Sequence, residues 1–151
     1  MPQSLAQLYT HLVFSTKERK TYLKDVALRD KLHAYLAGAC NQLKSPSIIV
    51  GGVEDHVHIL CRLSKTISVS ELIREIKRES SKWVKSESQR LYTFQWQSGY
   101  GAFSISPAHV EGLKRYIINQ PKHHEKVSFQ DEFRRLCRKF GLEIDERYVW
   151  D

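Results

Sequence analysis

Two histidines separated by one residue are the part of this sequence with the clearest capacity for chemistry. Residues 56–63 have the composition of a β-strand, whose successive side chains point to opposite faces. His56 and His58 therefore share one face, while Val57 and Ile59 share the other and can line a core. Two adjacent imidazoles suit a divalent metal ion. Because a bare His-x-His pair is more often free of metal, a metal site requires further ligands.

A tyrosine and a glutamine four residues apart form a second candidate pair. Ser106-Pro107 predicts the start of a helix, with serine as the cap and proline at the first position. Tyr116 and Gln120 then lie about one turn apart on the same helical face. A glutamine carbonyl oxygen can act as a third metal ligand, and a tyrosine oxygen is a competent nucleophile. Taken alone, the pair also fits a tyrosine packed at the rim of a helix interface.

The chemistry of phosphate esters gives a reason to join the two pairs. A phenol, with a pKa near ~10, is a weak nucleophile at neutral pH. A divalent cation can polarise a scissile phosphate and orient it for in-line attack. Attack by tyrosine gives a phosphotyrosine and a free hydroxyl, and it conserves the diester bond. A later strand can therefore reverse the reaction without ATP, so one nucleophile can both cut and join.

Charge and cysteine content narrow the class of protein. Lysine and arginine number 24 against 17 acidic residues, and the resulting net charge of +7 favours polyanionic partners such as nucleic acid. Cys40, Cys61 and Cys137 are far apart, so we expect neither a disulfide framework nor a zinc knuckle, and a reducing cytoplasm fits. We find no apolar run long enough to span a membrane and no signal-peptide pattern.

The order of the expected elements predicts the fold. They are a strand at 7–15, a helix at 25–43, strands at 47–53 and 56–63, a helix capped by Ser68, an extended stretch at 92–105, a helix from Pro107 and a helix at 129–140. The first six match the β-α-β-β-α-β arrangement of an α+β, ferredoxin-like antiparallel sheet. We expect one domain over 1–151, with a core at 1–106 and a helical part at 107–151 that carries the tyrosine.

Two segments resemble the motifs of a known family. Segment 52–60, Gly-Val-Glu-Asp-His-Val-His-Ile-Leu, resembles the histidine–hydrophobe–histidine (HUH) motif. Segment 114–120, Lys-Arg-Tyr-Ile-Ile-Asn-Gln, resembles the tyrosine helix of the single-tyrosine transposases. These enzymes, often called TnpA, belong to the small insertion sequences of the two-hundred and six-hundred-five series and have relatives linked to repetitive extragenic palindromes (REP). The segments 9–17 and 145–151 are also similar to that family.

The resemblance implies a ferredoxin-like fold and a Mg²⁺ or Mn²⁺ cofactor. It implies His56, His58 and Gln120 as metal ligands and Tyr116 as the nucleophile that forms a 5′-phosphotyrosine. It also implies a homodimer with composite sites, in which the tyrosine helix of one subunit serves the histidines of the other. The substrate would be single-stranded DNA with imperfect hairpins at the ends of the mobile element.

One residue departs from the family pattern. Pro121 directly follows Gln120, and proline disfavours helical geometry at the residue before it. We therefore expect Gln120 at a frayed helix end, where His123 or His124 could substitute as a ligand.

A nitrogen-rich site also suits Mn²⁺ better than Mg²⁺, which prefers oxygen.

A basic run over residues 74–85 is the candidate for phosphate contacts. Arg74, Lys77 and Lys82 are the predicted DNA-binding residues, with Lys77 the strongest because it also resembles the family. The glutamates between them fit a solvated helix face as well. His11, on the first strand, could approach the histidine pair, although an ordinary strand histidine is the simpler interpretation.

Other functions fit parts of the same pattern. The enzymatic alternatives are a replication initiator or relaxase of the HUH superfamily and a domesticated transposase that acts on genomic palindromes. The non-enzymatic alternative is a ferredoxin-like module whose basic sheet binds single-stranded nucleic acid. A Tyr116→Phe protein that behaves like the wild type in every assay would favour the binding module.

Overall fold

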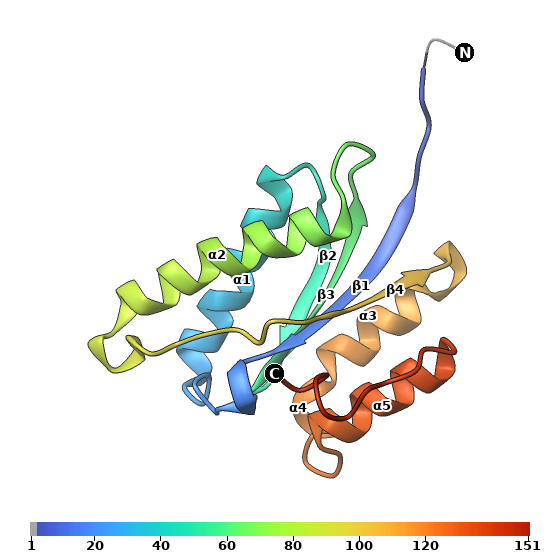
Figure 1. The fold of residues 1–151 in the computed structure, drawn as a ribbon. Coiled ribbons are helices and arrows are strands. Elements are labelled where there is room, and N and C mark those ends of the chain that lie inside the picture. The colour runs from blue at the N-terminus through green and yellow to red at the C-terminus, as the bar shows by residue number, and fades with distance from the viewer. Residues whose placement is uncertain (1–2) are drawn as a thin grey trace.

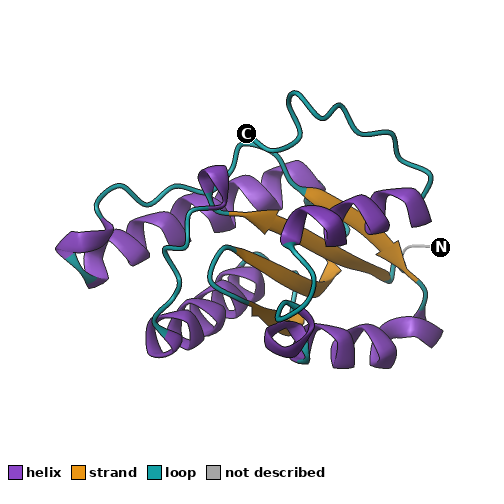
Figure 2. Cartoon of the chain, turned by 90° about the horizontal axis from the view of Figure 1, so that it is seen from below, coloured by secondary structure: helices purple, strands orange, loops and turns teal. Residues whose placement is uncertain are grey.

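The computed structural model describes residues 3–151 and contains one four-stranded sheet with helices on both of its faces (Figures 1 and 2). None of the described helices has the length and apolar character needed to cross a membrane. The elements are β1 (Leu8–Ser15), α1 (Val26–Gln42), β2 (Ser47–Gly52), β3 (His56–Leu63), α2 (Val69–Glu87), β4 (Gly101–Ile105), α3 (Val110–Ile118), α4 (Gln120–His123) and α5 (Phe129–Lys139), with 3₁₀ turns η1 (Lys17–Arg19), η2 (Gln89–Leu91) and η3 (Pro107–His109).

The topology confirms the predicted ferredoxin-like fold. The strands lie in the order β2-β3-β1-β4, and every neighbouring pair is antiparallel. Together with α1 and α2 they give the expected β-α-β-β-α-β order. β1 and β3 are therefore the central strands, and Val13 of β1 lies opposite His58 of β3. The histidine pair is thus placed in the middle of the sheet rather than at an edge.

The alternation of side chains divides the protein into two cores. On one face, Phe14, Val57 and Ile59 pack with the buried residues of α1 and α2. On the other face, Val13 and Phe103 pack with the aromatic residues of α5. Figure 1 shows α1 and α2 on one side of the sheet and α3, α4 and α5 on the other. The His56–His58 face is therefore the face that the C-terminal helices cover.

Helix starts agree with the sequence except at one position. The side chain of Ser68 accepts a hydrogen bond from the backbone N–H of Glu71, so its predicted capping role is confirmed. Ser106 was expected to cap the tyrosine helix, and this prediction is wrong. Its hydroxyl contacts Nδ1 of His109 at 2.6 Å, and no backbone N–H donates to it. The segment therefore begins as the 3₁₀ turn η3 before α3.

The predicted extended stretch at 92–105 is wrong in its first half, because only Gly101–Ile105 forms a strand. Phe94 and Trp96 instead turn their rings into the core beside α1 and α2. The ammonium group of Lys77 donates to the carbonyls of Gln97 and Gly99, at 2.7 Å each. A side chain thus satisfies backbone groups that a continuous strand would have paired with β1.

Two glycines allow the C-terminal helices to approach the sheet. A Cβ atom on Gly51 of β2 would lie 2.7 Å from Cγ2 of Ile117 on α3. A Cβ atom on Gly101 of β4 would lie 2.5 Å from Cε1 of Phe133 on α5. Both distances are shorter than a carbon–carbon contact allows. The backbone of α3 therefore lies directly on β2, whereas α5 places the ring of Phe133 against the backbone of β4.

Replacing Gly101 with alanine should destabilise the protein by about 1–3 kcal/mol, because the new methyl group forces the buried ring of Phe133 away from the sheet. Urea unfolding measures the effect. Gly99→Ala is the matched control, since a Cβ there would meet only the side-chain nitrogen of Gln97, at 3.9 Å. Equal stabilities of the two variants would contradict the close contact between Gly101 and the ring of Phe133.

Candidate active site

The two histidines of β3 are fully buried and point to the same face, as the strand period predicts. His11 on β1 lies beside them, and its Nε2 atom is 2.8 Å from Nδ1 of His58. The rings of His11 and His58 are stacked, with centroids 5.1 Å apart. His11 is therefore part of the site, which corrects its interpretation as an ordinary strand histidine.

Tyr116 and Gln120 lie against the histidines of their own chain. α3 crosses over Gly51, and the ring of Tyr116 is 5.9 Å from that of His58 between centroids. The helix was expected to end at Gln120, ahead of Pro121; it is interrupted one residue earlier, at Asn119, because α3 ends at Ile118 and α4 begins at Gln120. Gln120 is nevertheless fully buried rather than frayed, and its Oε1 atom is 3.1 Å from Nε2 of His56.

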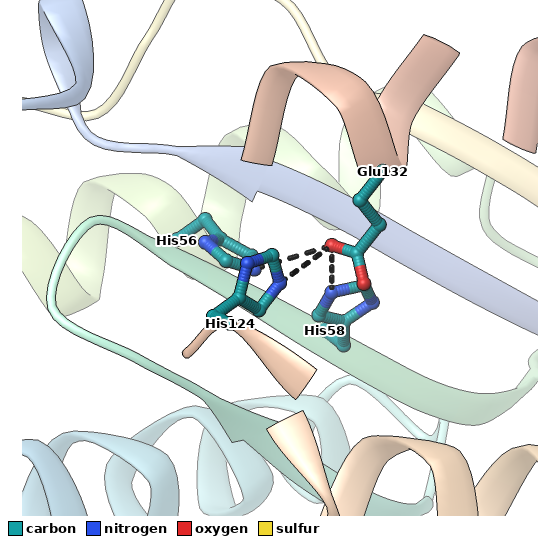
Figure 3. A group of neighbouring side chains, drawn as sticks. All are labelled: His56, His58, His124 and Glu132. Carbon is teal, nitrogen blue, oxygen red and sulfur yellow. Dashed lines mark hydrogen bonds and ion pairs between the residues drawn. The ribbon is translucent and has the colours of Figure 1, made fainter. Parts of the chain in front are cut away.

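The carboxylate of Glu132 on α5 connects these side chains (Figure 3). Its Oε1 atom lies 3.0 Å from Nε2 of His58, 3.1 Å from Nε2 of His124 and 3.3 Å from Nε2 of His56. Its Oε2 atom accepts a hydrogen bond from the Tyr116 hydroxyl and another, at 2.8 Å, from the Gln120 amide. A single buried carboxylate therefore contacts every predicted catalytic and metal-binding side chain.

Burial and hydrogen bonding act in opposite directions on the charged groups of the site. Burial would raise the pKa of Glu132, but hydrogen bonds from His124, His56 and His58 hold that pKa far below its usual value. Burial disfavours the charged form of His56, yet hydrogen bonds to Asp55 and Glu132 outweigh it and raise the pKa of His56 to about 9. An ionised Glu132 and a protonated His56 therefore form a buried ion pair.

Three other groups of the site, His58, His11 and Tyr116, stay neutral near pH 7. Burial lowers the pKa of both His58 and His11. Burial and the neighbouring Glu132 carboxylate raise the pKa of Tyr116, so its hydroxyl keeps its proton at neutral pH. If this oxygen acted as a nucleophile, its attack would require removal of that proton or a compensating positive charge.

Four side chains offer donor atoms for a metal ion. One ligand atom each of His56, His58, His124 and Glu132 lies within 4.8 Å of the others. Three of the donors are imidazole nitrogens, which suit manganese and later transition metals better than magnesium. Neutral His58 is ready to coordinate, whereas a metal would have to displace the proton of His56. The donor set fits a divalent transition-metal ion.

Sequence reasoning missed Glu132, although a signal for it was present. The predicted helix at 129–140 has apolar or buried residues at 129, 133, 136 and 137, which is the spacing of one helical face. Glu132 falls on that face, where a carboxylate needs buried partners. Both predicted substitute ligands lie near Glu132: Nε2 of His124 is 3.1 Å from Oε1, and Nε2 of His123 is 3.5 Å from Oε2. Only His124 belongs to the group of four donors, and the ring of His123 lies beside that of Tyr116.

The predicted DNA-binding residues lie away from this site, on α2 and across the sheet from the histidines. Arg74 and Lys82 are exposed by 69% and 70%, and each pairs loosely with a glutamate of the same helix. Lys77 is different, because its ammonium group is engaged with the carbonyls of Gln97 and Gly99. Burial lowers the pKa of Lys77 to about 8. Arg74 and Lys82 are therefore free to meet phosphates, while Lys77 already has partners.

A ferredoxin-like sheet whose His-x-His strand faces a tyrosine helix is the arrangement of the HUH-type tyrosine transposases. A family model described as "Transposase IS200 like" matches residues 4–120. The chain therefore belongs to the IS200-like transposase family. A search of curated proteins finds no match.

Two solved structures share the fold. A protein from Deinococcus radiodurans R1 assigned as a transposase has a TM-score of 0.60 at 21% identity, with 78% of this chain and 93% of that chain covered. A REP-associated tyrosine transposase bound to a REP hairpin has a TM-score of 0.60 at 15% identity, with 83% and 73% covered. At these identities the likeness concerns the fold.

The charge on His56 should make its contribution to stability depend on pH. Its folded-state pKa of about 9 lies above the ordinary value of 6.5, so the stabilisation is complete below 6.5 and is lost as the pH rises through 9. In the presence of chelator, the unfolding free energy lost in His56→Gln should be larger at pH 7 than at pH 10, by about 1–3 kcal/mol.

Chemical denaturation at the two pH values measures this difference. His33→Gln serves as the control, because burial lowers the pKa of His33 to about 4 and it stays neutral over the whole interval. A loss in His56→Gln that is the same at pH 7 and pH 10 would show that His56 is uncharged in the folded protein.

Proposed function

We propose that this protein is a DNA transposase that cleaves and rejoins single-stranded DNA through a covalent bond to Tyr116. The observation that carries the proposal is the meeting of the tyrosine with the histidine pair in one buried cluster. The Tyr116 hydroxyl shares the Glu132 carboxylate with His56 and His58. Membership in the IS200-like transposase family supports the same assignment.

In the proposed reaction, Oη of Tyr116 attacks the scissile phosphorus. A Tyr–O–P bond forms, the P–O3′ bond breaks, and the proton of the tyrosine ends on the 3′ oxygen that leaves. The product is a 5′-phosphotyrosine and a free 3′ hydroxyl. Attack by another 3′ hydroxyl reverses these steps and releases Tyr116, so strand joining needs no external energy source.

His56, His58 and Gln120 are the proposed holders of the metal ion that the family uses. A divalent ion, Mg²⁺ or Mn²⁺, would neutralise charge on the scissile phosphate and polarise it. The protein itself orients the nucleophile, because Glu132 accepts from the Tyr116 hydroxyl and fixes the direction of its oxygen. Gln120 donates to the same carboxylate and keeps it in place.

A hollow of about 200 Å³ opens beside the nucleophile and gives a phosphate a place to lie. Tyr116 and Glu132 form one part of its wall, and Arg135 and Lys139 of α5 form another. Both basic residues lie at the protein surface. Their positive charges would attract the DNA backbone toward the tyrosine. We therefore add Arg135 and Lys139 to Arg74 and Lys82 as proposed phosphate contacts.

The proposed substrate is single-stranded DNA with hairpin ends. A structural neighbour, the REP-associated tyrosine transposase, is bound to a REP hairpin. A homodimer with exchanged tyrosine helices stays a prediction from the family. In the single chain, Tyr116 lies over its own His58, which is the arrangement of a site served in cis.

The first test is formation of a covalent adduct. Purified protein is incubated with Mn²⁺ or Mg²⁺ and with single strands copied from both flanks of its gene, and adducts are separated on a denaturing gel. We expect an adduct with the wild type and none with Tyr116→Phe, while both bind the DNA equally. His56→Ala and His58→Ala should each lose metal-dependent cleavage.

The matched control is Tyr92→Phe, because Tyr92 is 75% exposed and stands outside the site. An adduct formed by Tyr116→Phe would exclude Tyr116 as the nucleophile. Tight binding without an adduct in any protein, on either flank and with either metal, would favour the non-catalytic nucleic-acid-binding module.

The two proposed pairs of phosphate contacts should both contribute to DNA binding, but only one pair should affect the rate of adduct formation. Arg74→Ala/Lys82→Ala and Arg135→Ala/Lys139→Ala should each weaken binding and reduce the salt dependence, by about one unit of slope for each phosphate that the variant no longer binds. Only the α5 pair lies beside Tyr116, so only its removal should slow adduct formation at saturating DNA. Filter binding across salt concentrations and single-turnover cleavage measure the two quantities. Unchanged binding in a double variant would remove that pair from the DNA interface.

A further inference from the structure

Three imidazole nitrogens converge on one point in the buried site. Nε2 of His56, His58 and His124 all lie between 3.0 and 3.3 Å from the same oxygen, Oε1 of Glu132. Figure 3 shows dashed lines from that oxygen to all three rings. His56, His58 and Glu132 are almost completely buried, and the side chain of His124 is 8% exposed. Such convergence of imidazole nitrogens on one point is the geometry of a metal-binding site.

The second nitrogen of each ring is held by a partner. Nδ1 of His56 lies 2.7 Å from a carboxylate oxygen of Asp55. Nδ1 of His124 lies 2.5 Å from the backbone carbonyl of Val127, to which it can only donate. Metal-binding histidines almost always donate their other N–H to such a carboxylate or carbonyl, because this fixes the ring and leaves the first nitrogen free to coordinate.

His58 follows the same pattern with a different partner. Its Nδ1 atom lies 2.8 Å from Nε2 of His11, and the two rings are stacked. With an ion bound, Nδ1 of His58 would be the donor toward His11, and Nε2 would give its lone pair to the ion in place of the hydrogen bond to Glu132. All three rings are therefore oriented by an outer contact, and all three can present Nε2 to a common ion.

Two of the four residues lie outside the segment that defines the family. His56 and His58 fall within the matched residues 4–120, whereas His124 and Glu132 follow them. The fold nevertheless positions both of them firmly. Ser128 caps α5, and the flanking Phe129 packs its ring against that of His56, with centroids 4.5 Å apart.

We propose that His124 and Glu132 are metal ligands, so that the metal centre of this protein has three histidines and one carboxylate. The site would then prefer Mn²⁺, Co²⁺ or Zn²⁺ over Mg²⁺, because Mg²⁺ binds imidazole poorly. Gln120 remains beside His56 as an additional oxygen donor. This proposal rests on the proposed function, because both place the metal ion at His56 and His58.

The distances allow this assignment. Two atoms bound to one ion at about 2.1 Å can be at most about 4.2 Å apart. The four donor atoms already lie within 4.8 Å of one another, so small rotations bring them to an ion. Oε1 of Glu132 stands close to the position that the nitrogens would share and must withdraw slightly. The Glu132 side chain has three rotatable bonds for this movement, and Oε2 can stay with Tyr116 and Gln120.

Metal binding can be measured without DNA. Protein freed of metal with a chelator is titrated with Co²⁺, followed by visible absorption, and with Mn²⁺ and Mg²⁺ by calorimetry. The wild type should bind Co²⁺ and Mn²⁺ far more tightly than Mg²⁺. His124→Gln and Glu132→Gln should each weaken Co²⁺ binding by about 100-fold, the upper end of the loss seen when an outer partner of a ligand is removed.

His109→Ala is the control for removal of an imidazole, because His109 is exposed and its ring hydrogen-bonds the Ser106 hydroxyl of its own turn. Circular dichroism and thermal unfolding without metal are used to check that each variant is folded. Should one glutamine variant fail to fold, Glu132→Asp provides a shorter carboxylate, whose partial recovery of affinity supports a ligand role.

The Co²⁺ titration also distinguishes a ligand role of Glu132 from an alternative in which its carboxylate blocks the metal site. If its carboxylate only occupies the place of the ion, Glu132→Gln will bind Co²⁺ more tightly than the wild type, and the proposal is overturned. Unchanged affinity in either glutamine variant overturns it as well. Tyr116→Phe should bind Co²⁺ like the wild type. A protein that binds metal through His124 and Glu132 but forms no DNA adduct would therefore refute the proposed function and leave the metal centre standing.

Discussion

The buried carboxylate of Glu132 is the charge on which the arrangement of the site depends. An isolated carboxylate inside a protein is unfavourable by several kcal/mol, so it persists only with enough hydrogen-bond donors around it. Here the donors come from β3, α3, α4 and the residue after α4, and they include Tyr116, the proposed nucleophile. Elements far apart in the sequence are thus held together by one charged group. Loss of that group would leave several buried polar atoms without partners.

The two faces of the sheet have different roles: one packs in the apolar core, and the other carries the residues of the candidate site. Alternate residues of β3 serve the apolar core under α1 and α2, and the residues between them serve the site. The histidines therefore stand on a strand whose other face is anchored by Val57 and Ile59 in a well-packed core. This rigid base is what a reaction that requires in-line geometry needs. The C-terminal helices supply the opposing half of the site, and their own core of aromatic residues docks them on the sheet.

Strand period and helix spacing were sufficient to predict the fold and part of the site. The parity of His56 and His58, the four-residue spacing of Tyr116 and Gln120, and the order of the first six elements are local properties of the chain. Glu132 could not be placed in this way, because its role depends on how α5 docks, which is set by tertiary contacts such as Gly101 against Phe133. The irregular path from 92 to 100 depends similarly on Lys77, whose side chain takes the carbonyls that a strand would have used.

The contact between Gly51 and Ile117 makes the position of the proposed nucleophile depend on a residue of a structural strand. Gly51 has no side chain to offer to the reaction or to DNA, yet the backbone of α3 rests on it one residue from Tyr116. Any side chain at position 51 would lift the tyrosine away from His58 while leaving every reactive group intact. A genetic screen for inactive alleles should therefore recover position 51 among the catalytic ones, and relatives that tolerate a larger residue there must have moved the tyrosine helix to compensate.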